Sequence, residues 1–205
     1  MTASKKAFTA VAVVLLILLA DQILKIWVKT HFVIGQESSL IPNFFTLSFV
    51  ENEGMAMGIK VFAKLFLTIF RIVASFAIIY YIYTLIRNNF KLVYIILVSM
   101  IFAGAVGNIL DSVFYGVIFS ESTPMHVAVL FPPEGGYGSW LHGEVVDMFQ
   151  FTSSWPSKIP WIGGKKVFPY IFNIADASIS VGIVVLLLFF RKTLSLSFEK
   201  QEVEN

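Results

Sequence analysis

The sequence predicts an all-α membrane bundle of four transmembrane helices, with a small β-sheet and a long loop on one side of the membrane. Hydrophobic residues make up 57% of the 205-residue chain and charged residues only 14%, whereas soluble globular proteins carry about 25% charged residues. A surface this poor in charge needs lipid to cover it. Four apolar segments are each long enough for a helix that crosses a bilayer, which takes about 20 residues.

The predicted helices lie within one membrane domain that covers residues 1–205, and they span about residues 7–28, 62–86, 92–119 and 168–190. Residues 87–90 form so short a turn that the second and third helices must be an antiparallel hairpin. With four spans, the termini share one side of the membrane, and the connecting segments 30–61 and 120–167 share the other. An alternative interpretation of residues 7–28 is a cleaved signal peptide. The absence of a convincing small-residue cleavage site favours a retained helix.

The two connecting segments carry the signals for the sheet. Residues 44–50 are rich in aromatic and β-branched side chains, and Asn52 and Gly54 break that run, which is typical of a strand followed by a turn. Residues 143–151 alternate loosely and predict another strand. The second segment also contains tryptophans of a kind that favours the lipid headgroup layer, namely Trp140, Trp155 and Trp161.

Composition excludes several classes of function. The chain has no cysteine, so disulfides, thiol nucleophiles, S-acylation and cysteine metal sites are excluded. A net charge of +2, spread along the chain, gives no indication of a nucleic-acid partner. Neither a His-Glu-x-x-His zinc motif nor a Gly-x-Ser-x-Gly elbow occurs, and we expect no metal or cofactor. A Ser–Lys dyad stays open, although no serine among the intramembrane polar residues has an obvious lysine partner.

Polar residues are expected at a similar depth in all four helices. Counted from the basic residue at the terminal side of each helix, they lie about 22–30 Å along the helix at 1.5 Å per residue. A charge at the bilayer centre costs about 2.5–3.5 kcal/mol or more, so groups in one such layer need each other, water or a function. The polar residues of this layer are Asp21, Arg71, Asn108, Asp111, Asn173 and Asp176.

Carboxyl groups are the chemically informative members of this layer. Two carboxyl groups about 3 Å apart cannot both ionise, so they share a proton, and such a pair can supply both the base and the acid of a hydrolysis. The four aspartates are Asp21, Asp111, Asp147 and Asp176. Each also has a structural interpretation: intramembrane polar side chains hydrogen-bond across helices, Asp21 and Lys25 suit a supporting ion pair, and Asp147 by itself suits a solvated loop.

Five short motifs occur in a fixed order along the chain. They are Asp21-Gln22-x-x-Lys25, Val50-x-Asn52-x-Gly54-x-Ala56, Gly107-Asn108-x-x-Asp111, Val145-Val146-Asp147 and Phe172-Asn173-x-Ala175-Asp176. In this order, and in a chain with four spans, they resemble the lipoprotein signal peptidases, or type II signal peptidases, of bacteria. The resemblance extends from about residue 15 to residue 185.

The resemblance implies an intramembrane aspartic endopeptidase of the bacterial cytoplasmic (inner) membrane. Such an enzyme removes the signal peptide from diacylglyceryl-modified prolipoproteins and cuts before the lipidated cysteine. The catalytic pair maps onto Asp147 and Asp176. The substrate-binding or supporting positions map onto Asn52, Gly54, Asn108, Asp111, Asn173, Asp21 and Lys25. The implied partners are lipidated prolipoproteins and membrane lipid, and we expect a monomer.

Orientation follows from the resemblance better than from charge. Lysine and arginine divide equally between the two sides, so the positive-inside rule does not decide, although Lys5 and Lys6 before the first span favour a cytoplasmic N-terminus. The resemblance implies cytoplasmic termini, with the sheet, the long loop and the active site near the outer, extracytoplasmic face.

Two departures from the family pattern stand out. Ser112 occupies a position where the family usually has an arginine, and Arg71 is a candidate substitute. Residues 120–141 look like an insertion. The alternative function is a small transporter coupled to protons or cations through the buried aspartates. Four spans, no internal repeat and polar groups displaced towards one face disfavour it.

Overall fold

The computed structural model describes residues 1–52 and 60–204, and it describes side chains for residues 1–52 and 64–197. The chain forms two compact units. The helical unit comprises Met1–Asp21, Thr68–Ile109 and Ile174–Asn205. The sheet unit comprises Gln22–Leu67 and Leu110–Asn173.

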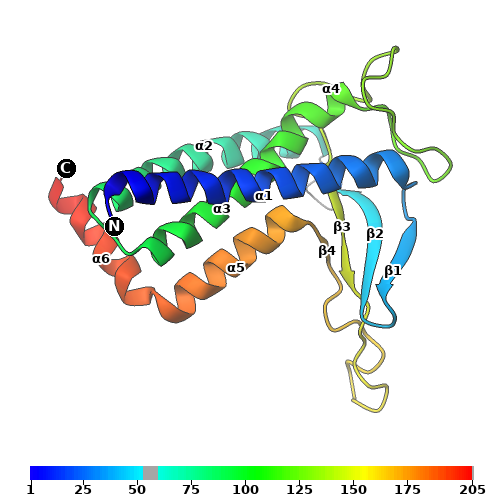
Figure 1. Ribbon diagram of the computed structural model, residues 1–205. Helices are drawn as coiled ribbons and strands as arrows, with labels where there is room; N and C mark the ends of the chain where they lie inside the picture. The colour runs from blue at the N-terminus through cyan, green and yellow to red at the C-terminus, as the bar shows by residue number, and fades with distance from the viewer. Residues whose placement is uncertain (53–59, 205) are drawn as a thin grey trace. The chain divides into compact units, whose positions relative to one another are not determined.

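Helices make up most of the described chain (Figure 1). They are α1 (Ala3–His31), α2 (Lys60–Arg87), α3 (Leu92–Leu110), α5 (Ile174–Phe189) and α6 (Arg191–Glu204). Helix α3 continues into a π-helical turn at Asp111–Tyr115 and the short α4 at Gly116–Ile118. A π-helical turn inside a long helix is often found at a functional site.

Three stretches of helix in the described residues are long and apolar enough to cross a membrane. They are Ala3–His31, Lys64–Arg87 and Leu92–Ile118. Helix α5 is shorter, and it meets α6 at a bend of 94°, so these two helices make a fourth span only if the bent pair counts as one. The structure thus confirms a helical protein with three or four candidate spans, and the count of four stays a prediction.

Helix α5 begins at Ile174, six residues later than the predicted start at residue 168. Residues 171–172 instead form strand β4, which pairs with β3 at Phe149 and Gln150. Pro169 explains part of the difference, because proline lacks an N–H donor and disfavours helix in the residue before it. The flanking aromatic residues suit a strand as well as a buried helix.

The described strands form a small antiparallel sheet in the order β1-β2-β3-β4. A small sheet was predicted from the sequence. They are β1 (Glu37–Ile41), β2 (Phe45–Asn52), β3 (Val145–Phe151) and β4 (Ile171–Phe172). Successive side chains of a strand point to opposite faces. Val146 and Met148 therefore enter the core of the sheet unit, whereas Asp147 projects from the other face, as does Phe149, whose ring lies tilted against that of Phe172.

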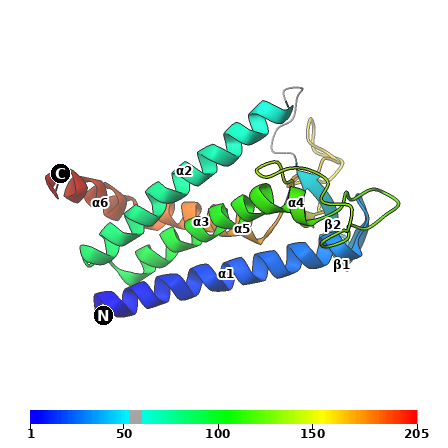
Figure 2. The same ribbon diagram turned by 90° about the horizontal axis from the view of Figure 1, so that it is seen from above.

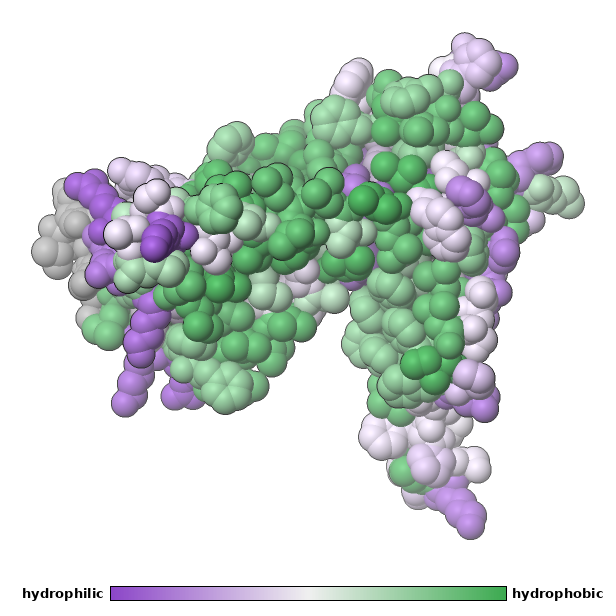
Figure 3. Space-filling view, in the orientation of Figure 1, coloured by the Kyte–Doolittle hydropathy of each residue, from purple (hydrophilic) through white to green (hydrophobic). Residues whose placement is uncertain are grey.

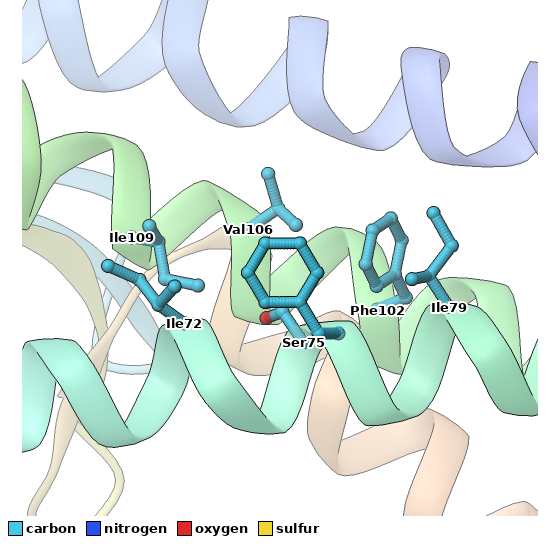
Figure 4. A pocket seen from close by; sticks show the side chains of 7 residues that line it. Ile72, Ser75, Ile79, Phe102, Val106 and Ile109 are labelled. Carbon is cyan, nitrogen blue, oxygen red and sulfur yellow. The ribbon is translucent and has the colours of Figure 1, made fainter.

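The helical unit has its own core. It gathers Ala10 of α1, Leu85 of α2, Tyr94 of α3 and Leu186 of α5, and Figure 2 shows α3 running between α1 and α2. A groove of about 220 Å³ lies between α2 and α3 (Figure 4). Its lining is apolar except for Ser75. In Figure 3 hydrophobic side chains cover most of the visible surface of the helices, as a lipid-facing surface requires.

Glycine brings α3 and α5 close together. A Cβ atom on Gly104 would lie 2.3 Å from the carbonyl oxygen of Ala175, and one on Gly182 would lie 3.0 Å from that of Leu97. Small residues at helix contacts are common in membranes, where packing and hydrogen bonds drive helix association. This close approach fixes the start of α5, where Asp176 lies.

Candidate functional site

Asp147 lies on β3 in the sheet unit and accepts hydrogen bonds from two asparagines. Asn173 Nδ2 donates to Asp147 Oδ1 at 2.7 Å, and Asn52 Nδ2 donates to Oδ2 at 3.0 Å. Asn52 pairs with Val145 in the β2–β3 ladder, two residues from Asp147, so the two side chains are diagonal neighbours on one face of the sheet. Asp147 is only 4% exposed, so its carboxylate is held by these amides more than by water.

Asn173 joins the end of β4 to β3. Its side chain is fully buried, and Nδ2 also donates to the carbonyl oxygen of Val146 at 3.2 Å. Since an ionised carboxylate only accepts hydrogen bonds, the two amide donors favour a charged Asp147. Asn173 thus orients Asp147 in two ways: it donates to the Asp147 carboxylate and to the backbone carbonyl of Val146, the preceding residue.

Asp176 lies in the first turn of α5, in the helical unit, where it is half-buried. Asn108 Nδ2 of α3 donates to Asp176 Oδ1 at 2.8 Å. The N-terminus of a helix carries partial positive charge and favours a carboxylate. Asp176 therefore has the same kind of donor as Asp147, with a helix terminus in addition.

Asp21 supports the same helix start. Its Oδ1 accepts a hydrogen bond from the backbone N–H of Ala175 at 2.9 Å, and the first N–H groups of a helix have no partner within the helix. A Cβ atom on Gly107 would lie 2.9 Å from Asp21 Oδ2, so a glycine at this position leaves room for the carboxylate. Asp21 acts here on the backbone next to Asp176.

Asp111 is buried in the sheet unit and is held by several donors. Lys25 Nζ lies 2.8 Å from Asp111 Oδ2, and neither side chain is exposed. Gln22 Nε2 donates to Oδ1 at 2.9 Å, and the backbone N–H of Val146 donates to Oδ2 at 3.3 Å. The last bond ties Asp111 to the strand residue that precedes Asp147, so Asp111 supports the position of β3.

The structure groups the predicted site residues by unit. Asp147, Asn52, Asn173, Asp111 and Lys25 share the sheet unit, and Asp176, Asn108 and Asp21 share the helical unit. Gly54 lies outside the described residues. Among the described residues, no cluster of three His, Asp or Glu could hold a metal ion.

Sequence reasoning missed the pairing of Lys25 with Asp111 and the part played by Gln22. Tyr115 donates its hydroxyl to Gln22 Oε1 at 3.2 Å, while Gln22 donates to Asp111. The only sequence signal was that Gln22 sits inside the first motif. Ser112 is buried, and its carbonyl accepts a bond of 2.8 Å from the N–H of Gly143. A role for Arg71 in place of the usual arginine stays a prediction.

The chain is similar to a known family of proteins. The model of the signal peptidase (SPase) II family matches residues 13–192. The lipoprotein signal peptidase of Porphyromonas gingivalis is 47% identical over 191 residues, which cover 90% of this chain and 84% of that protein. The lipoprotein signal peptidase of Amoebophilus asiaticus is 34% identical, with 97% of this chain and 84% of that protein covered.

A solved structure agrees with these relatives. A bacterial membrane enzyme determined by the in meso method at 2.3 Å resolution superimposes with a TM-score of 0.60 and 26% identity, over 90% of this chain and 89% of that one. The family match spans most of the sequence and includes all the candidate site residues discussed above. This chain therefore belongs to the signal peptidase II family.

Proposed function

We propose that Asp147 and Asp176 are the two catalytic carboxyl groups of this peptidase. As a member of its family, the chain removes signal peptides from prolipoproteins in the membrane. The observation that carries the proposal is the matched environment of the two aspartates: Asn173 and Asn52 donate to Asp147, and Asn108 donates to Asp176. In addition, Asn173 precedes Asp176 by only three residues in the sequence.

The proposed chemistry needs one proton on the pair. The ionised carboxylate takes a proton from water as the water oxygen attacks the scissile carbonyl, and the protonated carboxyl donates its proton to the leaving amine. Two interacting carboxyl groups titrate as a unit and can hold one proton between them. The asparagine amides fix where the oxygens point, and proton transfer by positioned groups typically contributes about 10²- to 10⁴-fold to a rate.

The proposed substrate is a prolipoprotein with a diacylglyceryl group on the cysteine that follows the scissile bond. Its apolar signal helix enters from the bilayer while the acyl chains stay in lipid, which holds the bond at the depth of the carboxyl groups. Such positioning lowers the entropic part of the barrier. Asn52, Gly54, Asn108 and Asn173 would contact the substrate or support the site. Membership of a peptidase family disfavours a transporter.

Cleavage should depend on the lipid. With purified enzyme in detergent, we expect a diacylglyceryl-modified precursor to be cut before its cysteine, and the same precursor without the lipid to stay intact. Mass spectrometry of both products identifies the cleavage site. The precursor without the lipid, which differs only in its unmodified cysteine, is the matched control. Equal cleavage of the two precursors, or cleavage elsewhere, contradicts the proposed specificity.

We propose cytoplasmic termini and an active site near the outer face of the inner membrane, in a monomeric protein. Lys5 and Lys6 in the first turn of α1 support this orientation. Because the chain has no cysteine, single cysteines report topology without a background signal. An impermeant maleimide added to intact cells should label a cysteine at Glu134 and should leave one at Asn88 unlabelled until the cells are opened. The reverse pattern would mean that the opposite orientation is correct.

A further inference from the structure

Lys29, in the last turn of α1, is a fully buried lysine that the proposed reaction does not use. Its Nζ pairs with Glu51 Oε1 and donates to Ser122 Oγ at 3.0 Å. Ser122 Oγ in turn donates to the same Glu51 oxygen at 2.9 Å. A buried charge is costly unless partners compensate it, and the partners of Lys29 come from two other segments of the sheet unit. These contacts therefore hold the three segments together.

Aromatic rings complete the surroundings of the lysine. Nζ lies 5.4 Å from the ring centre of Phe119 and 4.9 Å from that of Tyr137, within the range of cation–π attraction. Burial raises the pKa of Tyr137 above its usual range, and the negative charge of Glu51 acts in the same direction. The phenol therefore stays neutral, and its oxygen accepts a hydrogen bond of 2.7 Å from the backbone N–H of Glu144.

Ser122 and Tyr137 belong to residues 120–141, the insertion noted in the sequence. Backbone hydrogen bonds fasten this loop to its surroundings. The N–H of Ala128 donates to the carbonyl of Lys29 at 3.3 Å, and the N–H of Ile34 donates to that of Thr123 at 3.2 Å. The N–H of Tyr137 donates to the carbonyl of Phe119 at 2.9 Å. The loop is thus attached to the end of α1 and encloses the lysine.

Glu51 connects this cluster to the candidate site. It precedes Asn52 at the end of β2 and pairs with Val146, whereas Asn52 pairs with Val145. Their side chains leave opposite faces of the strand, so Glu51 reaches Lys29 while Asn52 reaches Asp147. The β2–β3 register is irregular between Leu47 and Val50, so the hydrogen bonds between the strands hold the end of β2 less firmly. The contact of Glu51 with Lys29 therefore helps to fix the backbone that carries Asn52.

We propose that Lys29, Glu51 and Ser122 form a buried clamp through which the inserted loop positions Asn52 against Asp147. Lys29, Glu51 and Ser122 are then positioning residues of the peptidase. This role rests on the proposed function of Asp147. It assigns the insertion a task inside the enzyme: to close one side of the clamp and supply its hydroxyl group.

A double-mutant cycle tests the clamp. Ser122→Ala removes one hydroxyl without leaving a charge unpaired, and Asn52→Ala removes the group that the clamp is said to position. We expect Ser122→Ala to lower kcat about three- to tenfold, which is the size of one hydrogen bond's net contribution. In the Asn52→Ala background it should lower kcat less than about twofold, because the positioned side chain is gone.

Thr123→Ala is the matched control, since among the described residues the hydroxyl of Thr123 contacts only Met125 and His126, both in the same loop. It should leave kcat within about twofold in both backgrounds, within the range of an ordinary surface substitution. Glu51→Gln serves as a second clamp variant, and the melting temperature of each variant reports folding separately from turnover.

The outcomes separate the clamp from the dyad. Equal losses from Ser122→Ala with and without Asn52, or no loss in either background, overturn the clamp and leave a purely structural role for these residues. If Asp147→Asn remains active, the proposed function fails whatever the cycle shows. If Asp147→Asn is inactive and the cycle is additive, only the clamp is wrong.

Discussion

Replacing either Asp147 or Asp176 by asparagine is expected to abolish cleavage of a diacylglyceryl-modified precursor. Asparagine is nearly isosteric with aspartate but cannot serve as a general base or acid at these positions. The loss should reach at least the about 10²- to 10⁴-fold that positioned proton transfer contributes. Both variants should stay folded in detergent, because the amide keeps the shape of the side chain that Asn173 or Asn108 contacts.

Cleavage of the lipidated precursor by each purified variant, followed on a gel and by mass spectrometry, measures this effect, and a thermal melt confirms folding. Glu37→Gln is a suitable control, because Glu37 is an exposed carboxylate on β1 of the sheet unit. It should cut at the wild-type rate. Should either aspartate variant do the same, the assignment of the catalytic pair is wrong.

Lys25→Met is expected to be the most destabilising of the substitutions considered. It leaves the Asp111 carboxylate buried without the lysine that lies 2.8 Å away. Removing one partner of a buried ion pair typically costs about 3–5 kcal/mol of folding free energy. Gln22 and the N–H of Val146 still donate to Asp111, so the geometry near Asp147 should survive in the molecules that fold.

The free energy of unfolding should therefore fall more than the turnover per folded molecule. Denaturation in detergent measures the first quantity, and kcat normalised to the folded fraction measures the second. Lys5→Met provides the control, because Lys5 is an exposed lysine of the same helix, and it should change neither quantity appreciably. Unchanged thermal stability together with lost activity would assign Lys25 a direct role in the chemistry instead.

The membrane class and the sheet could be predicted because both depend on patterns within short stretches of sequence. Apolar segments of spanning length mark the helices, and residues 44–50 and 143–151 carried recognisable strand signals. The start of α5 could not be predicted in this way. A short apolar, aromatic run such as Phe168–Phe172 fits a buried strand or a helix equally well, and its pairing with β3 decides between them.

The candidate site was predictable as a set of residues and less so as a set of contacts. The spacing of four residues suggested that Asp21 and Lys25 share a helix face. The structure adds partners that are distant in sequence, such as Asp111 for Lys25 and Asp176 for Asn108. Periodicity within one helix contains no information about a partner many residues away, nor about the π-helical turn that carries Asp111.

Three residues of the short segment from Asn173 to Asp176 form hydrogen bonds with three different side chains. Asn173 donates to Asp147, Ala175 donates to Asp21, and Asp176 accepts from Asn108. These residues lie in the last fifth of the chain and leave the ribosome after all three of their partners, since synthesis proceeds from the N-terminus. Asp147 and Asp21 therefore gain these donors only when translation is nearly complete, and a nascent chain that stops before residue 173 lacks Asp176, which the proposed reaction requires.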